Sequence, residues 1–77
     1  MTAWPSDLSR TRALATMKSL GFEMVRTGNH ISLTATSNDG TRRTMTLPNH
    51  RRINGSTLQT ACRLAGIDRD QFLDALR

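Results

Sequence analysis

The chain has 77 residues and only three aromatic side chains, so we expect a single small domain over residues 1–77 with one hydrophobic core. It contains no apolar run near the roughly 20 residues of a membrane-spanning helix and no apolar stretch typical of a secretory signal. The single cysteine, Cys62, excludes an internal disulfide framework and a multi-cysteine zinc site. This cysteine usage fits a reducing, cytoplasmic environment.

The formal net charge is +5, and the surplus is confined to part of the chain. Residues 1–20 carry +2, residues 21–53 carry +3, and residues 54–77 are neutral. Ten of the eleven cationic side chains are arginine, whose planar guanidinium suits bidentate contact with phosphate. The charge therefore favours a polyanionic partner, nucleic acid foremost, with an acidic protein surface as the alternative.

Residues 1–8 are expected to form a loosely ordered extension, and the first helix is predicted over Ser9–Leu20. Its apolar residues recur at spacings of three and four: Ala13, Leu14, Met17 and Leu20. Ser6 or Ser9 can cap its start, and Gly21 is placed to end it. The basic side chains of this helix are expected on its solvent side: Arg10, Arg12 and Lys18.

Three strands are predicted next, over residues 22–27, 30–36 and 41–47. Gly28–Asn29, two residues that tolerate positive φ, predict a tight turn between the first two, and Ser37–Gly40 predicts the second turn. Alternation places one set of side chains toward the helices: Ile31, Leu33, Arg43, Met45 and Leu47. The opposite set is polar and is expected on an open face: His30, Ser32, Thr34, Arg42, Thr44 and Thr46.

The third strand is predicted to stop at Pro48, and Asn49–Gly55 is expected to be an irregular basic loop. A second helix is predicted from Ser56, where Ser56 and Gln59 have capping-box spacing. Gly66 ends this helix, and Asp68 opens a last short helix. The expected fold is α+β in the order α-β-β-β-α-α, a three-stranded antiparallel sheet with helices on one face.

Five short segments of the sequence are each a weak signal alone, but their order and separations together are specific for one family. They are Leu20-Gly21-Phe22, Arg26-Thr27-Gly28-Asn29-His30, Arg42-Arg43-Thr44-Met45-Thr46-Leu47-Pro48, Ile53-Asn54-Gly55-Ser56-Thr57-Leu58 and Leu64-Ala65-Gly66-Ile67. Over residues 9–76 the chain thereby resembles the HicA (YcfA-like) family of toxins from type II toxin–antitoxin systems. The resemblance implies a fold like the double-stranded-RNA-binding domain and an mRNA interferase that needs no metal or other cofactor. Its implied partners are RNA and a HicB-like antitoxin, and no association with a membrane is implied.

The resemblance also implies a catalytic histidine at His30, on the second strand after Gly28–Asn29. Many members of the family have a second histidine directly after the first, but this chain has Ile31 there. A mechanism with adjacent histidines is therefore excluded. A histidine after the proline that ends the third strand also recurs in the family, and His50 occupies that place as a possible second acid or base.

Chemistry supports His30 independently, because RNA cleavage without a metal needs a base near neutral pH for the 2′-hydroxyl proton. Imidazole, whose ordinary pKa is about 6.5, is the side chain matched to that task. Arg26 and Arg42 are the candidates to neutralise charge on the reacting phosphate. The remaining expected RNA contacts are Asn29, Arg51 and Arg52, of which the two arginines would hold the RNA backbone without reading its sequence.

Two other functions remain open from the sequence. One keeps the fold without the chemistry, as a noncatalytic RNA-binding or antitoxin-docking module in which His30 only begins a strand. The other is a helix-turn-helix DNA binder over residues 58–76, although its second helix carries three aspartates that DNA would repel. Cys62 lies on an apolar helix face and is expected to be a buried structural thiol.

Overall fold

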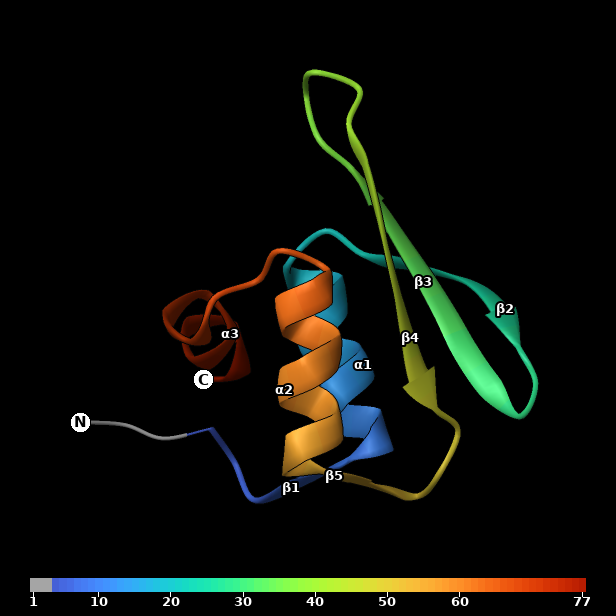
Figure 1. Cartoon of the computed structure of the whole chain (residues 1–77), viewed down its shortest axis with the longest axis vertical. Coiled ribbons are helices and arrows are strands. Elements are labelled where there is room, and N and C mark those ends of the chain that lie inside the picture. Colours follow the sequence, from blue (N-terminus) through green and yellow to red (C-terminus); the bar gives the residue numbers. More distant parts are fainter. Residues whose placement is uncertain (1–3) are drawn as a thin grey trace.

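The computed structural model describes residues 4–77, which form three helices and five strands (Figure 1). In chain order these are β1 (Asp7–Ser9), α1 (Arg10–Ser19), β2 (Glu23–Thr27), β3 (His30–Thr36), β4 (Arg42–Pro48), β5 (Arg52–Asn54), α2 (Gly55–Leu64) and α3 (Arg69–Leu76). Strands β2, β3 and β4 form an antiparallel sheet in that order, with the helices on one side of it. The predicted α+β fold is therefore confirmed. Within residues 4–77, no helix is both long enough and apolar enough to span a membrane.

The alternation predicted along β3 and β4 is confirmed by burial. Ile31 pairs with Leu47 and Leu33 with Met45, and all four side chains are buried toward the helices. The neighbouring pairs, Ser32 with Thr46 and Thr34 with Thr44, lie on the opposite face and reach solvent. Because side chains on a strand alternate between faces, this register divides the sheet into one apolar and one polar surface.

The helices supply the other half of the core. The apolar positions predicted from helical spacing are buried where they face the sheet: Ala13 and Met17 in α1, and Leu58, Ala61 and Cys62 in α2. Phe72 of α3 is fully buried, and its ring centroid lies 5.3 Å from that of Trp4. The segment before α1 thus contributes an aromatic contact to the core.

The end of the expected irregular loop is instead a strand. Arg52–Asn54 forms β5, which pairs antiparallel with β1 in a separate two-stranded sheet, so the prediction of a loop up to Gly55 is wrong there. Leu8 lies opposite Ile53, which is fully buried. Part of the segment expected to be a loose extension is therefore held by β5, while residues 1–3 lie outside the described structure.

The helix ends follow the predicted chemistry with one exception. Ser9 caps α1 and Asp68 caps α3, where Asp68 and Gln71 form a full capping box. The cap of α2 is Asn54, not Ser56, because the helix begins one residue earlier than predicted, at Gly55. Asn54 accepts from the backbone N–H of Ser56 at 2.8 Å, the contact that an N-cap makes.

The absence of a side chain at Gly55 is required by this early start. Its N–H donates to the Ser6 carbonyl at 2.8 Å, and a Cβ there would meet the carbonyl oxygens of Pro5 and Ser6. The backbone before β1 therefore lies directly against the first turn of α2.

We expect Gly55→Ala to lower the free energy of unfolding by about 1–3 kcal/mol, the usual range for forcing an extra carbon into a filled space. The loss should occur even though alanine favours a helix over glycine by about 1 kcal/mol. Urea unfolding measures it, with Gly28→Ala as the matched control, since a Cβ at Gly28 meets nothing within 4 Å. An unchanged or raised midpoint for Gly55→Ala would contradict this packing.

Candidate active site

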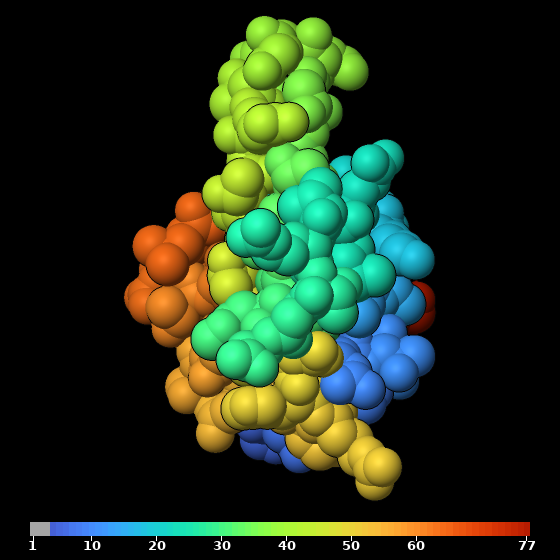
Figure 2. Space-filling view, turned by 90° about the vertical axis from the view of Figure 1, so that its right-hand side faces the viewer, coloured from blue at the N-terminus to red at the C-terminus, as the bar shows by residue number. Residues whose placement is uncertain are grey.

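The outer face of the three-stranded sheet is polar and uncovered. It carries Glu23, Ser32, Thr34, Thr44 and Thr46, all exposed or half-buried. Figure 2 shows this side of the molecule, with β2 and β3 outermost and the tip of the β3–β4 hairpin projecting above the body. Met24 and Val25 of β2 are also exposed, but the hydroxyl groups that dominate β3 and β4 on this face are suited to a polar, hydrogen-bonding ligand.

His30 lies at one end of this face. It is the first residue of β3, is exposed, and pairs with Pro48, the last residue of β4. The preceding turn differs from the predicted one, because neither Gly28 nor Asn29 adopts positive φ. The last β2–β3 pair is Thr27 with Ile31, and the Gly28 N–H donates to the His30 carbonyl at 3.1 Å. His30 thus stands just beyond the β2–β3 ladder.

Arg26 reaches the same end of the face through a β-bulge in β2. Met24 pairs with Leu33, but Arg26 pairs with Ser32, so Val25 is an extra residue in the register. Without the bulge, Arg26 would lie opposite Ile31 and point toward the helices. The bulge turns it onto the open face instead. Its partner Ser32 is two residues from His30 on β3, a separation of about 7 Å along the strand.

Arg42 lies at the other end of the sheet. It is on the open face, as alternation predicted, while Arg43 faces the helices and donates to the Gly66 carbonyl at 3.3 Å. However, Arg42 pairs with Thr36, six residues along β3 from His30, which corresponds to about 20 Å. The structure therefore does not bring Arg42 together with His30, because the two mark opposite ends of one hairpin (Figure 1).

The loop between β4 and β5 joins the end that carries His30. The Asn49 N–H donates to the Asn29 carbonyl at 3.1 Å, one step beyond the His30–Pro48 pair. His50 and Arg51 follow in this loop and are exposed. Both histidines of the chain thus belong to the same end of the sheet, together with Asn29 and Arg51.

Arg52 has a partner within the chain. Its guanidinium donates twice to Asp7, from Nε at 3.1 Å and from Nη2 at 2.9 Å, and so links β5 to β1. Hydrogen bonding from Arg52 holds the pKa of the Asp7 carboxyl below its ordinary value. Both side chains are about half exposed, so this ion pair is a modest contribution to stability. Arg52 is first of all a contact between the two short strands.

Two side chains that sequence reasoning did not single out as site residues hold this end of the sheet. Asn49 donates to the Gly28 carbonyl at 2.8 Å, and Arg10 of α1 donates to the Asn49 side-chain oxygen at 2.8 Å. Arg10 is half-buried, contrary to the expected solvent-facing position. Arg10 is 39 positions from Asn49, and Asn49 is 21 positions from Gly28. No local pattern in the sequence could therefore have predicted these contacts.

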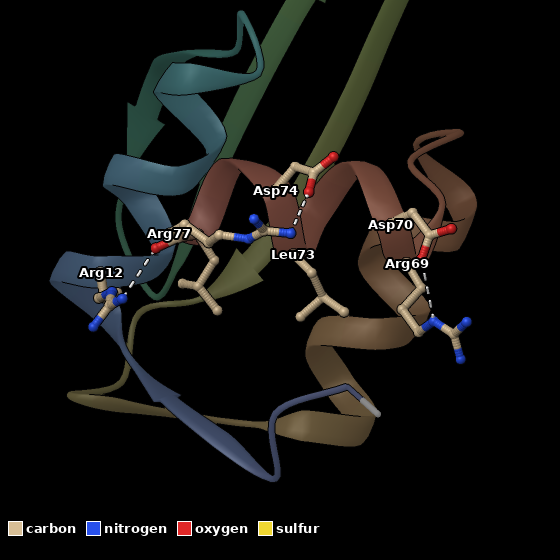
Figure 3. A pocket seen from close by; sticks show the side chains of 7 residues that line it. Arg12, Arg69, Asp70, Leu73, Asp74 and Arg77 are labelled. Carbon is tan, nitrogen blue, oxygen red and sulfur yellow. Dashed lines mark hydrogen bonds and ion pairs between the residues drawn. The ribbon is translucent and has the colours of Figure 1, made fainter. Parts of the chain in front are cut away.

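Another α1 arginine contributes to a pocket at the α1–α3 contact, which Figure 3 shows from close by. The pocket has a volume of about 570 Å³ and is lined by Arg12, Arg69, Asp70, Leu73, Asp74, Leu76 and Arg77. Arg12 donates to the Leu76 carbonyl at 3.0 Å, and Arg77 pairs with Asp74 at 3.0 Å. Its charges are mixed and largely engaged with one another, and neither histidine lines it.

The remaining chemistry-bearing side chains have structural roles. Cys62 is fully buried, as expected, and burial raises the pKa of its thiol to about 11, which keeps it protonated at neutral pH. Asp39 accepts hydrogen bonds from Ser37 and Thr41, and these bonds order the β3–β4 turn. The same bonds lower the pKa of the Asp39 carboxyl to about 2. Among residues 4–77, no three His, Cys, Asp or Glu side chains are grouped so that they could hold a metal ion.

Comparison with known proteins identifies the family. The sequence model described as the HicA toxin of bacterial toxin–antitoxin systems matches residues 11–67, well over half of the chain. The match takes in α1 from its second residue, all three strands of the larger sheet and α2. No curated protein and no solved structure is significantly similar to the chain. The chain belongs to the HicA toxin family of bacterial toxin–antitoxin systems.

Proposed function

We propose that the protein is the toxin of a HicAB-type pair and acts as a metal-independent endoribonuclease that cleaves mRNA, with His30 as the catalytic acid or base. One observation carries the proposal: an exposed histidine stands at the end of an open polar sheet face, and a β-bulge delivers Arg26 beside it. Family membership supports the toxin role. The positions of His30 and Arg26 support a reaction site at this end of the sheet.

The reaction that suits these groups uses the RNA itself as nucleophile. The His30 imidazole takes the proton from a 2′-hydroxyl, and the oxygen attacks the adjacent phosphorus. The bond from phosphorus to the 5′-oxygen of the next nucleotide breaks, and a proton is delivered to that leaving oxygen. The products are a 2′,3′-cyclic phosphate and a 5′-hydroxyl, so atoms and charge balance without a water or a cofactor.

Arg26 supplies charge for the reacting phosphate, because it is the one arginine of the sheet that lies near His30 on the open face. A guanidinium aimed at the developing negative charge stabilises the transition state. Asn29 and Arg51 border the same end and are suited to hold the RNA backbone. Arg42 would touch RNA only at a distance from the reacting phosphate, and Arg52 would first have to leave Asp7.

His50 is the candidate for the second proton transfer. It follows Asn49, whose backbone N–H donates to the carbonyl of Asn29, the residue before His30, so the segments of both histidines meet at one end of the sheet. Ile31, where many members of the family have a second histidine, is 1% exposed and belongs to the core. A second acid or base would therefore come from another segment, and His50 in the β4–β5 loop is the candidate.

The partner of this toxin would be a HicB-like antitoxin. Family membership places the chain in a toxin–antitoxin pair. An antitoxin that covers the open sheet face at His30 would block access of RNA, whereas one that binds only the α1–α3 side would leave that face free. Both proteins would meet in the cytoplasm, where mRNA is the substrate.

The first prediction concerns His30. We expect His30→Ala to abolish growth arrest and to lower RNA cleavage by about 10²–10⁴, the usual contribution of a positioned acid or base. Because His30 is exposed, the variant should keep the parent's urea midpoint. An alanine variant as toxic as the parent would refute the assignment. Tight RNA binding without cleavage by the parent would instead favour the noncatalytic module.

The second prediction compares two arginines of the same face. Arg26→Ala should lower cleavage on the order of 10², as loss of a charge-stabilising donor does. Arg42→Ala should change it by less than about threefold, because about 20 Å exceeds the screening length of about 8 Å at physiological ionic strength. Single-turnover rates on one RNA oligonucleotide measure both, and the two variants have the same net charge. Equal losses would contradict the separation derived from the β3–β4 register.

A further inference from the structure

Asn49 is the junction of three segments that are remote in sequence. Its side-chain nitrogen donates to the Gly28 carbonyl at 2.8 Å, and its backbone N–H donates to the Asn29 carbonyl at 3.1 Å. Its side-chain oxygen accepts from Arg10 Nη1 at 2.8 Å. The amide orientation follows from chemistry, because a carbonyl needs a donor and a guanidinium needs an acceptor. Asn49 therefore binds the turn before His30 on one side and α1 on the other.

Arg10 completes this junction from the first residue of α1. While its guanidinium holds the Asn49 side chain, its own backbone N–H donates to the Arg51 carbonyl at 2.9 Å. The two contacts fix the β4–β5 loop on both sides of His50. A half-buried charged donor to an amide oxygen is also a stronger hydrogen bond than a neutral one. We call these three residues, Arg10, Asn49 and Gly28, the clamp.

The β2–β3 turn has no buried side chain of its own. Residues 23–30 are all exposed, so no packed side chain holds the β2–β3 turn from below. The turn also lacks the positive-φ geometry that locks a tight hairpin through its own backbone. His30 itself pairs with Pro48 in the β3–β4 ladder, and the two hydrogen bonds of Asn49 extend this attachment to Gly28 and Asn29, the two turn residues before it. Figure 2 shows residues near 30 lying directly against those near 50 on this side.

We propose that Arg10 and Asn49 are positioning residues for the reaction, which set the place of His30 relative to His50 and the reacting phosphate. This rests on the proposed ribonuclease function. Neither residue needs to touch RNA. A displacement of about 1 Å in a catalytic group can cost on the order of 10² in rate, so a turn without the clamp would bind RNA yet cleave it slowly.

The test uses variants that remove one contact at a time. Asn49→Asp keeps the acceptor for Arg10 but replaces the donor to Gly28 with a second oxygen, so the turn is released while the side-chain shape is preserved. Arg10→Ala removes the other contact, and Arg10→Lys keeps a single donor. The matched control is Arg12→Ala, which deletes an arginine of the same helix and its hydrogen bond to the Leu76 carbonyl.

We expect Asn49→Asp and Arg10→Ala to lower the single-turnover cleavage rate about tenfold to a hundredfold. Their affinity for an uncleavable RNA with 2′-deoxy nucleotides should stay close to that of the parent. Arg10→Lys should restore part of the rate, and Arg12→Ala should cleave like the parent. In parallel, backbone NMR order parameters of residues 28–30 should fall toward 0.6 in Asn49→Asp and stay near 0.85 in Arg12→Ala.

Several results would overturn the proposal. The clamp would not position His30 if Asn49→Asp and Arg10→Ala cleaved as fast as Arg12→Ala, or if their loss lay in RNA affinity alone. It would also fail if order at residues 28–30 were unchanged. Failure of the underlying function is a separate result, since it would show as an inactive parent or an active His30→Ala variant.

Discussion

The helices of this protein cover only one face of its three-stranded sheet, and the other properties of the molecule follow from that. With 36% hydrophobic residues, the chain has enough apolar side chains for one layer between sheet and helices. Ile31, Leu33, Met45 and Leu47 fill it from the sheet side and are nearly inaccessible to solvent. The strict period of two along β3 and β4 then leaves the outer face to hydroxyl and charged side chains.

The two ends of that open face differ. At the hairpin tip, β3 and β4 project past the body, and their turn is ordered by the Asp39 carboxylate (Figure 1). At the other end, the β2–β3 turn is tied to the β4–β5 loop and through it to α1. A reaction that requires fixed geometry is better placed at the tied end, because groups there are held relative to one another. Both histidines belong to that end.

Much of the fold could be predicted from the sequence because its signals are local. The spacing of Met17 and Ala13, the alternation of Ile31 and Leu33, and the capping box at Asp68 each follow from a few consecutive residues. The pairing of β1 with β5 could not be predicted, since strands of three residues show no periodicity. The early start of α2 at Gly55 depends on this pairing, because the chain before β1 lies against that glycine.

The candidate site was predictable in its residue types and only partly in its geometry. His30 and His50 were indicated by the family resemblance and by the chemistry of imidazole, and the structure brings their segments together. The bulge that turns Arg26 outward is an irregularity in register, and the alternation of residues along a strand does not predict it. Arg42 was predicted to act near His30 because alternation places both on the same face of the sheet. The distance between two residues on one face depends on the strand register, which the sequence pattern does not give.

We propose that this end of the sheet cleaves RNA through the 2′-hydroxyl of the substrate. The most direct measurement is cleavage of a defined RNA oligonucleotide by the purified protein in excess chelator, with the product ends identified by mass spectrometry. We expect a 2′,3′-cyclic phosphate and a 5′-hydroxyl, and no cleavage at a bond whose 5′-side nucleotide carries a 2′-deoxy substitution. Cleavage that requires an added divalent cation, or that proceeds at the 2′-deoxy position, would contradict it.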